Sequence, residues 1–251
     1  MSEPKAAAPI VTEDHLLGGR VRLRQPAEGY RAAIDPVFLA AAVAAEPHEL
    51  VLDVGCGPGA AMLCLTARAQ CRVVGLEMQR ELVRLAGDNA ILNGVEARVS
   101  AMIGDLLHAP PRLPPGAFDH VMANPPHLDR GRAAAVASPE KAEATIEGEA
   151  DLAAWVRFSL AMARSKGSVT FIHRADRIEA LLAEIAGRAG EIVVYPLWPG
   201  PVKPAVRVLV RARKDIASPS RIAPGLVLND PDGRPTAAAE AVLREGRGLD
   251  L

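Results

Sequence analysis

The stretch VLDVGCGPGA, residues 51–60, restricts the fold of this chain more than any other. An apolar run from Leu50 to Val54, interrupted only by Asp53, leads into glycines at positions 55, 57 and 59. Glycines at such a corner let the chain turn sharply and let a ligand approach the backbone. The stretch therefore predicts a buried strand that passes through a ligand-binding turn into a helix.

Strands and helices alternate along most of the remaining chain. The last two predicted strands follow each other with no helix between them, so we expect them to pair antiparallel. The pattern predicts an α/β sandwich with a mostly parallel sheet. The predicted strands are 50–54, 71–76, 97–103, 118–123, 168–173, 191–197 and 205–211, and the predicted helices are 34–45, 60–68, 80–92, 152–164 and 176–188.

We predict one domain, residues 1–251, because no repeat and no domain-sized linker interrupts the pattern. Asp35 is the expected N-cap of the first helix, with Pro36 at the first helical position. The expected parts are a tail at 1–14 and a strand or hairpin at 15–31, within an N-terminal segment 1–34; a catalytic core at 35–212; and a C-terminal extension at 213–251 with a short helix at 237–244.

Composition excludes several classes of protein. Apolar residues make up 49% and the formal charge is −1, so the chain is globular and lacks an overall nucleic-acid signature. Three cysteines without paired spacing predict neither a disulfide framework nor a metal site. The N-terminus lacks the apolar core of a signal peptide, and the longest apolar run, 37–45, is too short for a membrane span. We expect a cytoplasmic protein.

The glycine loop, residues 55–59, has three competing interpretations. A phosphate loop of the Walker type would need a lysine after the last glycine, and none is present. A dinucleotide loop would read G-x-G-x-x-G, and its pyrophosphate would be repelled by Asp53. A plain structural turn is the third interpretation. Asp53 favours a ligand that carries positive charge.

Two further acids follow predicted strands. Glu77 ends the second strand, and Asp105 follows the third in the sequence MIGDL. Ligands of open α/β sheets bind at the carboxyl ends of strands, where an acid can hold both ribose hydroxyls. Each acid alone would be an ordinary solvated side chain. Three acids at three successive strand ends, around one glycine loop, predict a ligand site.

The sequence NPPH, residues 124–127, follows the fourth strand. Proline cannot donate to a sheet, and it forces the preceding residue out of the helical region, so Asn124 must lie on a stiff, extended corner. The Asn124 side-chain oxygen and the Pro125 carbonyl can accept both hydrogens of an amine. Such fixed acceptors would orient the nitrogen lone pair toward an electrophile. A loop that merely ends a strand is the simpler alternative.

DVGCGPG, Glu77, Gly104-Asp105 and NPPH together resemble the class I S-adenosylmethionine-dependent methyltransferases, and in particular the subset with an [N/D/S]-P-P-[Y/F/W] motif. The resemblance implies a Rossmann-like three-layer sandwich with a seven-stranded sheet whose last two strands form a hairpin. It implies S-adenosyl-L-methionine as cofactor, no metal, and catalytic roles for Asn124, Pro125, Pro126 and His127. The implied cofactor-binding residues are Asp53, Gly55, Cys56, Gly57, Gly59, Glu77, Met78, Asp105, Leu106 and Asn124.

The flanking sequences resemble a narrower family, the bacterial tRNA (adenine-N6)-methyltransferases that act near the valine-tRNA anticodon. This resemblance rests on YRAAIDPVFLAAAV at 30–43, HRADRIEALL at 173–182, PLWP at 196–199 and RVLVRARK at 207–214. It implies tRNA as partner and adenine N6 as target. His127 departs from the family pattern, in which an aromatic residue stacks on the base.

Weaker signals and rival functions complete the expectations. His173 and Arg174 end the fifth strand, where they would line the cleft or be solvated. The five cations of 198–214, with Arg20, Arg22, Arg24 and Arg31, would form an RNA-facing surface or two wet strand faces. The rivals are a protein glutamine N5-methyltransferase, which usually has a helical domain before the core, a small-molecule methyltransferase, and a cofactor-binding module without catalysis.

Overall fold

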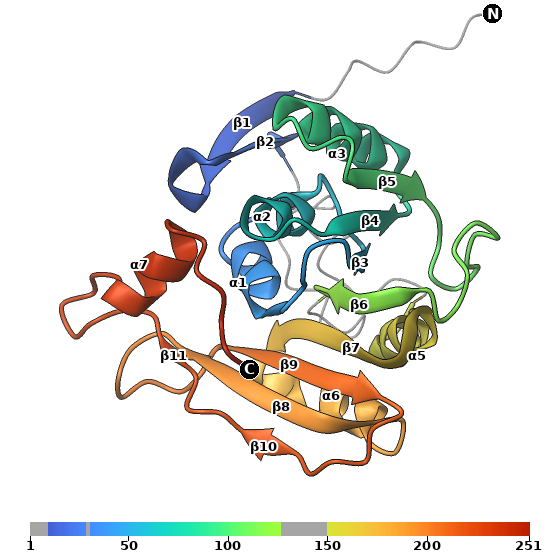
Figure 1. The fold of residues 1–251 in the computed structure, drawn as a ribbon. Helices are drawn as coiled ribbons and strands as arrows, with labels where there is room; N and C mark the ends of the chain where they lie inside the picture. The colour runs from blue at the N-terminus through green and yellow to red at the C-terminus, as the bar shows by residue number, and fades with distance from the viewer. Residues whose placement is uncertain (1–9, 29–30, 127–149) are drawn as a thin grey trace, which may run out of the picture.

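The computed structural model describes residues 10–28, 31–126 and 150–251. Its centre is a mostly parallel sheet in which nine strands take part within the described residues, in the order β10-β8-β9-β7-β6-β3-β4-β5 with β11 also paired to β8 (Figure 1). The strands are β3 (Leu50–Val54), β4 (Arg72–Glu77), β5 (Val99–Ile103), β6 (Phe118–Ala123), β7 (Ala163–Arg174), β8 (Ala189–Trp198), β9 (Arg207–Lys214), β10 (Arg221–Ile222) and β11 (Leu226–Val227).

The predicted α/β fold is confirmed. Strands β3 to β7 are parallel to one another, and β9 lies antiparallel between β7 and β8. The seven predicted strands form the body of the sheet, and the two-residue strands β10 and β11 extend its edge beside β8. The hairpin of β8 and β9 puts the last long strand inside the sheet rather than at its edge.

Helices cover both faces of the sheet, which gives three layers (Figure 1). Val51 and Leu52, neighbours on β3, are both fully buried and belong to different core clusters, as expected for a strand covered on both sides. One face packs against α1 (Asp35–Ala42), α2 (Ala60–Arg68), α3 (Arg80–Leu92) and α7 (Ala237–Leu243), and the other against α5 (Leu152–Met162) and α6 (Ile178–Ile185).

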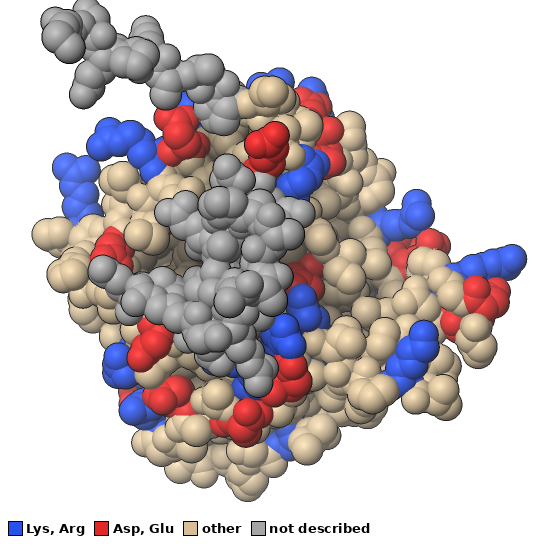
Figure 2. Space-filling view, turned by 180° about the vertical axis from the view of Figure 1, so that it is seen from behind, with Lys and Arg blue, Asp and Glu red and all other residues tan. Residues whose placement is uncertain are grey.

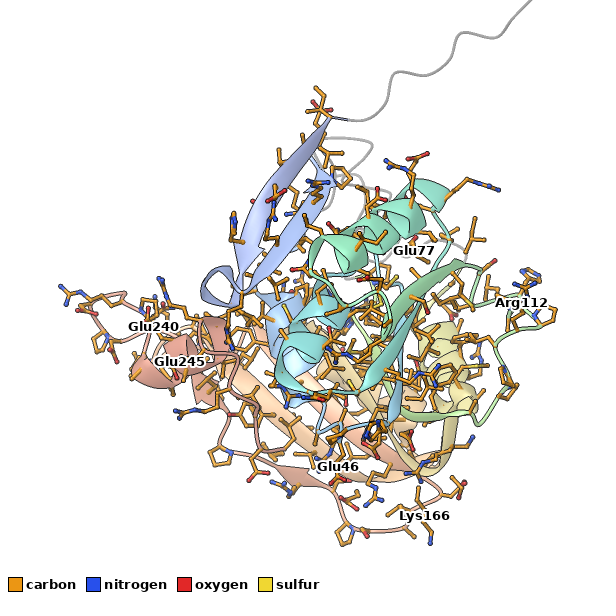
Figure 3. The ribbon with its side chains drawn as sticks, turned by 45° about the horizontal axis from the view of Figure 1, so that its top comes forward. Glu46, Glu77, Arg112, Lys166, Glu240 and Glu245 are labelled. Atoms are coloured by element: carbon orange, nitrogen blue, oxygen red, sulfur yellow. The ribbon has the colours of Figure 1, made fainter. Side chains whose placement is uncertain are left out.

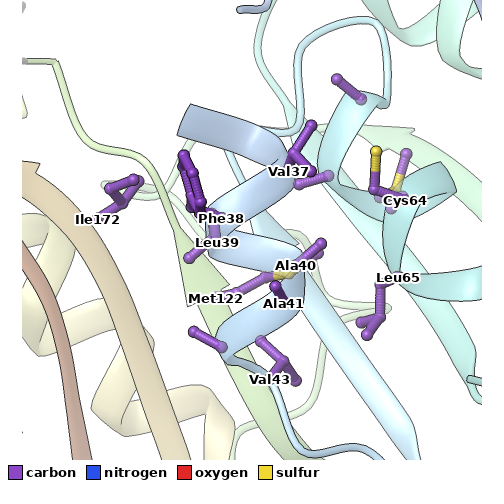
Figure 4. Packing of buried hydrophobic residues seen from close by; sticks show 14 of the residues in the cluster. Val37, Phe38, Leu39, Ala40, Ala41, Val43, Cys64, Leu65, Met122 and Ile172 are labelled. Carbon is purple, nitrogen blue, oxygen red and sulfur yellow. The ribbon is translucent and has the colours of Figure 1, made fainter. Parts of the chain in front are cut away.

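Helix α1 fills the centre of the first face with one large side chain among several small ones. Phe38 is fully buried beside Leu39, Met122 and Ile172 (Figure 4). Alanines on the same helix let α1 and α2 approach closely, which explains how a chain with so few aromatic residues still closes its core. Truncating a buried Phe to Ala typically costs about 3–5 kcal/mol.

Two predictions about the N-terminal segment need correction. Residues 11–14 are not part of a tail: they form β1 (Val11–Leu16), which pairs antiparallel with β2 (Val21–Pro26) around the short 3-10 helix η1 (Leu17–Gly19). Glu13 and Asp14 of β1 bind arginines, which holds this strand in place. Asp35 is not an N-cap, because it is the first residue of α1 and its carboxylate accepts from Arg207 Nε at 2.9 Å.

The chain after β9 packs back onto the first helical layer. The Leu249 N–H donates to the Ala41 carbonyl at 2.8 Å, and Leu251 and Val242 are buried. The short C-terminal helix was predicted at 237–244 and is observed at Ala237–Leu243. In the part of the chain that the structure describes, no helix combines the length and apolar character that crossing a bilayer requires.

Candidate functional site

The site residues lie at the carboxyl edge of the sheet, defined here as the edge where β3, β4, β5 and β6 end. Val54, the last residue of β3, is paired with Ala123, the last residue of β6. Gly55 and Asn124 therefore leave neighbouring strands at the same level, about 5 Å apart by strand spacing. Glu77, labelled in Figure 3, ends β4 on the other side of β3.

The glycine loop requires glycine at each alternate position. Gly55, Gly57 and Gly59 have φ of 70°, 55° and 93°, which side chains disfavour. A Cβ on Gly55 would lie 2.4 Å from the Trp155 ring, whereas a Cβ on Gly57 would meet nothing within 4 Å. Packing against Trp155 therefore requires glycine at position 55. Gly57 is required only by its backbone conformation, and the space beside it is open.

Glu77 connects β4 to this loop. Its side chain is 8% exposed, and its two carboxylate oxygens accept from the backbone N–H groups of Gly57 at 3.1 Å and Gln79 at 2.8 Å. Burial raises the pKa of Glu77, although the backbone hydrogen bonds act in the opposite direction. A carboxylate offers about four lone-pair positions, so Glu77 can still accept a hydrogen bond from a ligand beside the backbone N–H groups of Gly57, Met78 and Gln79.

Asp53 is buried beneath the same loop with one oxygen unsatisfied. Its residue is 3% exposed, and among the described residues Oδ2 has no hydrogen-bond partner. Burial raises the pKa of Asp53 well above its usual range, and the neighbouring charge of Glu77 adds to this effect. An unpaired buried acid is costly, and a cationic ligand would offset that cost. Cys56, also buried, has a strongly raised thiol pKa and is unsuited to nucleophilic chemistry.

The third predicted acid occupies a local turn. Asp105 accepts from the Leu107 N–H at 2.9 Å and lies 3.2 Å from His108 Nδ1. Leu106 is partly buried against the second core cluster. Met78, just after β4, is 69% exposed, so the ends of β4 and β5 present apolar surface beside a carboxylate. That combination suits a flat, polar-edged ring.

The NPP corner follows β6 directly. Asn124 is half-buried, Pro125 is buried and Pro126 is half-buried. The corner lies beside the glycine loop, as expected from parallel pairing of β3 with β6. His127, the fourth residue of the predicted motif, lies outside the described residues.

The basic residues do not form one surface. Strand β9 crosses the sheet, so Arg207, which pairs with Arg174, lies at the carboxyl edge while Lys214 lies at the opposite edge. Arg22 and Arg24 both bind Glu13. Figure 2 shows acidic and basic side chains interspersed over the face it presents. Lys203, in the exposed turn between β8 and β9, is the described lysine of this cluster nearest to the carboxyl edge.

Two residues at the site were missed by sequence reasoning, and one was misjudged. Trp155 of α5 packs its ring against Gly55, and Asn89 of α3 donates to the Pro58 carbonyl at 2.9 Å. No sequence pattern marks Trp155 as a site residue. Asn89 stands four residues before Asn93, and this helical spacing could have indicated that both amides lie on the same face of the helix. His173 is fully buried, so it is not a solvated strand end. Arg174 binds Asp176.

Comparison with known proteins shows that the chain is similar to methyltransferases in sequence and in structure. A family model described as "Methyltransferase domain" matches residues 51–139. A predicted O-methyltransferase of Agrobacterium tumefaciens has a similar solved structure, with a TM-score of 0.72 at 23% identity over 86% of this chain and 98% of that one. This likeness shows the fold, a Rossmann-like methyltransferase fold.

Curated relatives differ in what they act on. An rRNA N(6)-adenosine-methyltransferase of Caenorhabditis elegans is 24% identical over 65% of this chain and 69% of its own. A tRNA1(Val) (adenine(37)-N6)-methyltransferase of a Shewanella strain is 26% identical over 41% and 44%. A putative protein N5-glutamine methyltransferase of Methanocaldococcus jannaschii is 29% identical over 43% and 52%. The chain spans less than a quarter of the length of three relatives that match at 36–38% identity.

Residues 51–139 thus match a methyltransferase domain, and S-adenosyl-L-methionine is bound in a solved methyltransferase of similar fold, the geranyl diphosphate methyltransferase. The observed residues fit this group, because Asp53 offers a buried, unsatisfied oxygen to a cation and Glu77 keeps accepting capacity for a ribose hydroxyl. Within the described residues, no group of three His, Cys, Asp or Glu side chains is arranged to hold a metal ion.

Proposed function

We propose that this protein is an S-adenosylmethionine-dependent N-methyltransferase that methylates the N6 amine of an adenine in tRNA. The observation that carries the proposal is the pairing of Val54 with Ala123, which puts the Asn124–Pro125 corner directly beside the glycine loop. A methyl donor held by the loop and an amine held by the corner would then lie side by side.

Each part of the cofactor would have its own partners. Asp53 and the glycine loop would hold the cationic methionine end, because Asp53 lacks a partner for Oδ2 within the described chain. Glu77 would hold the ribose hydroxyls through the lone pairs that Gly57 and Gln79 leave open. Apolar surface near Met78, together with the Asp105 carboxylate, would hold the adenine ring. The residues in contact would be Asp53, Gly55, Cys56, Gly57, Gly59, Glu77, Met78, Asp105, Leu106 and Asn124.

The target amine needs help because its lone pair is delocalised into the ring. The Asn124 side-chain oxygen and the Pro125 carbonyl would accept its two hydrogens, which favours a pyramidal nitrogen with its lone pair directed at the methyl carbon. The bound cofactor supplies a methyl group on a sulfonium. As the N–C bond forms the C–S bond breaks, and the nitrogen then loses a proton to water. Pro125 and Pro126 keep both acceptors from relaxing.

The substrate is tested by methyl transfer from a deuterium-labelled donor to total tRNA, taken from cells that lack this gene. Nucleoside mass spectrometry should find labelled N6-methyladenosine. The target base must leave its stack to reach the corner, so unfolded or fragmented tRNA should also be accepted, with changed selectivity. Label in another nucleoside would overturn the assignment of adenine N6.

A second candidate, transfer to a glutamine side chain of a protein, is favoured by the charges at the carboxyl edge. Arg207 binds Asp35, Arg174 binds Asp176, and Arg31 binds Asp14, so these arginines are already neutralised by neighbours. Affinity for nucleic acid comes largely from cations that neutralise phosphates. The same assay run on a protein extract, with N5-methylglutamine as the product sought, distinguishes the two candidates.

A further inference from the structure

The side-chain amide of Asn89 joins three parts of the protein. Its Oδ1 accepts from the Arg24 backbone N–H at 2.8 Å, and its Nδ2 donates to the Arg24 carbonyl at 2.8 Å and to the Pro58 carbonyl at 2.9 Å. Asn89 lies on α3, Arg24 on β2 and Pro58 in the glycine loop. The residue is fully buried, and its bond to Pro58 is shielded from water, whereas the two bonds to the Arg24 backbone are partly buried.

Asn93, one helical turn later, makes a similar contact without reaching the loop. Its Oδ1 accepts from the Arg22 N–H at 2.9 Å and its Nδ2 donates to the Arg22 carbonyl at 2.7 Å. The two asparagines thus give β2 the backbone hydrogen bonds that a neighbouring strand would otherwise supply. They differ in their third contact: Asn89 donates to the Pro58 carbonyl of the glycine loop, whereas Asn93, which is only half-buried, donates to the Asn89 carbonyl at 2.8 Å.

The hairpin, β1 with β2, is held by this attachment and by Val21 and Leu23 of β2, which are buried in the first core cluster. A groove of about 430 Å³ separates part of it from α3, with Glu13, Arg24 and Arg84 on its walls. An isolated two-stranded hairpin is marginal in water. Helix α3 also packs against the glycine loop through Ala86. A Cβ added to Gly59 would lie 3.5 Å from the Cβ of Ala86.

We propose that Asn89 is a positioning residue that couples the hairpin to the cofactor loop. A ligand that orders the glycine loop would then also order the hairpin. Because coupling between two sites is reciprocal, loosening the hairpin would lower the affinity of the loop for the ligand by a corresponding factor. The coupling rests on the proposed function only in that the ligand of the loop is taken to be the cofactor. It gives the hairpin a mechanical link to cofactor occupancy.

The first measurement uses the unaltered protein. Hydrogen exchange of peptides from residues 11–26 is compared with and without S-adenosylhomocysteine. The coupling predicts slower exchange in the hairpin when ligand is bound. Unchanged exchange in the hairpin, with clear protection of residues 55–59, would overturn the proposal.

The second measurement compares Asn89→Ala with the matched variant Asn93→Ala. Both should speed exchange in the hairpin. Only Asn89→Ala should also speed exchange at residues 55–59 without ligand, abolish the ligand-dependent protection of the hairpin, and weaken S-adenosylhomocysteine by about tenfold or more. Equal effects of the two variants on the loop would mark both asparagines as merely structural. If the wild type binds no S-adenosylhomocysteine, the proposed function fails, and the ligand-free exchange at residues 55–59 alone decides the coupling.

Discussion

The Gly57 N–H donates to the Glu77 carboxylate across 3.1 Å, so the glycine loop and the end of β4 are joined into a single unit. The loop gains an anchor from the acid, and the acid is held with its remaining lone pairs available. This contact explains why Glu77 is tolerated at 8% exposure. It also means that Glu77 affects both the shape and the chemistry of the pocket.

Replacing Glu77 by alanine should weaken S-adenosylhomocysteine by about tenfold or more, because a charged hydrogen-bond acceptor contributes about 1.5–3 kcal/mol. Calorimetry measures the affinity. Glu77→Gln is the control, because its amide oxygen can still accept a hydrogen bond but its nitrogen cannot. Its affinity for S-adenosylhomocysteine should lie between those of the wild type and Glu77→Ala. The wild type should not bind NADH, and tight binding of NADH would contradict the assignment of the cofactor.

Asp53 should impose a cost on stability that depends on pH. Burial raises the pKa of Asp53 in the folded protein. At a pH between the unfolded and the folded pKa, the carboxyl therefore keeps its proton in the folded state and is ionised in the unfolded state. Stability from this group is therefore complete below the unfolded pKa and is lost as pH rises toward the folded one.

The variant Asp53→Asn removes this titration. Its melting temperature should exceed that of the wild type at pH 8 by more than it does at pH 4, while its affinity for S-adenosylhomocysteine should fall. Melting curves at both pH values provide the measurement. A difference that does not change with pH would mean that Asp53 is solvated or paired in the folded protein.

The sequence was sufficient to predict the sheet and to predict which residues lie together at its carboxyl edge. Apolar runs and glycines locate β3 and its loop, and parallel pairing then brings Asp53, Glu77 and Asn124 to one edge. Contacts between distant segments were not predictable. The bond from Asn89 to Pro58 depends on how α3 packs over the loop, and Trp155 reaches Gly55 from the opposite face. Neither follows from local periodicity.

Charge also shows where sequence reasoning stops. Five cations in residues 198–214 look like one basic cluster, but a strand that crosses the sheet separates Arg207 from Lys214. Similarly, Glu13 and Asp14 were assigned to a tail, although Glu13 binds Arg22 and Arg24 of the hairpin and Asp14 binds Arg31, which follows the hairpin. Ion pairs between strands become visible only once the register is known.

If tRNA binds at the carboxyl edge, Lys203 should contribute to binding. Lys203→Gln should weaken tRNA binding and reduce the slope of log affinity against log salt by about 1, because one phosphate contact is lost. Lys166→Gln is the matched control, since Lys166 lies in β7 at the opposite edge of the sheet (Figure 3). Equal slopes for both variants would exclude Lys203 from the RNA-binding surface.

His127 provides a test of base stacking. Stacking of a base on an aromatic side chain is worth about 1–3 kcal/mol and tolerates different rings. His127→Tyr should therefore keep or raise activity on tRNA, while His127→Ala should lower it about tenfold or more. Identical rates for the alanine variant and the wild type would remove His127 from the site.

The central claim is that Asn124 acts on the amine during transfer, and one measurement tests it most directly. The single-turnover rate of methyl transfer is compared between wild type and Asn124→Ala, with S-adenosylhomocysteine affinity and melting temperature measured on the same samples. By analogy with donors of an oxyanion hole, the barrier should rise by about 2–4 kcal/mol while affinity and melting temperature stay unchanged. An unchanged rate, or a variant that loses its fold or its cofactor, would contradict the account.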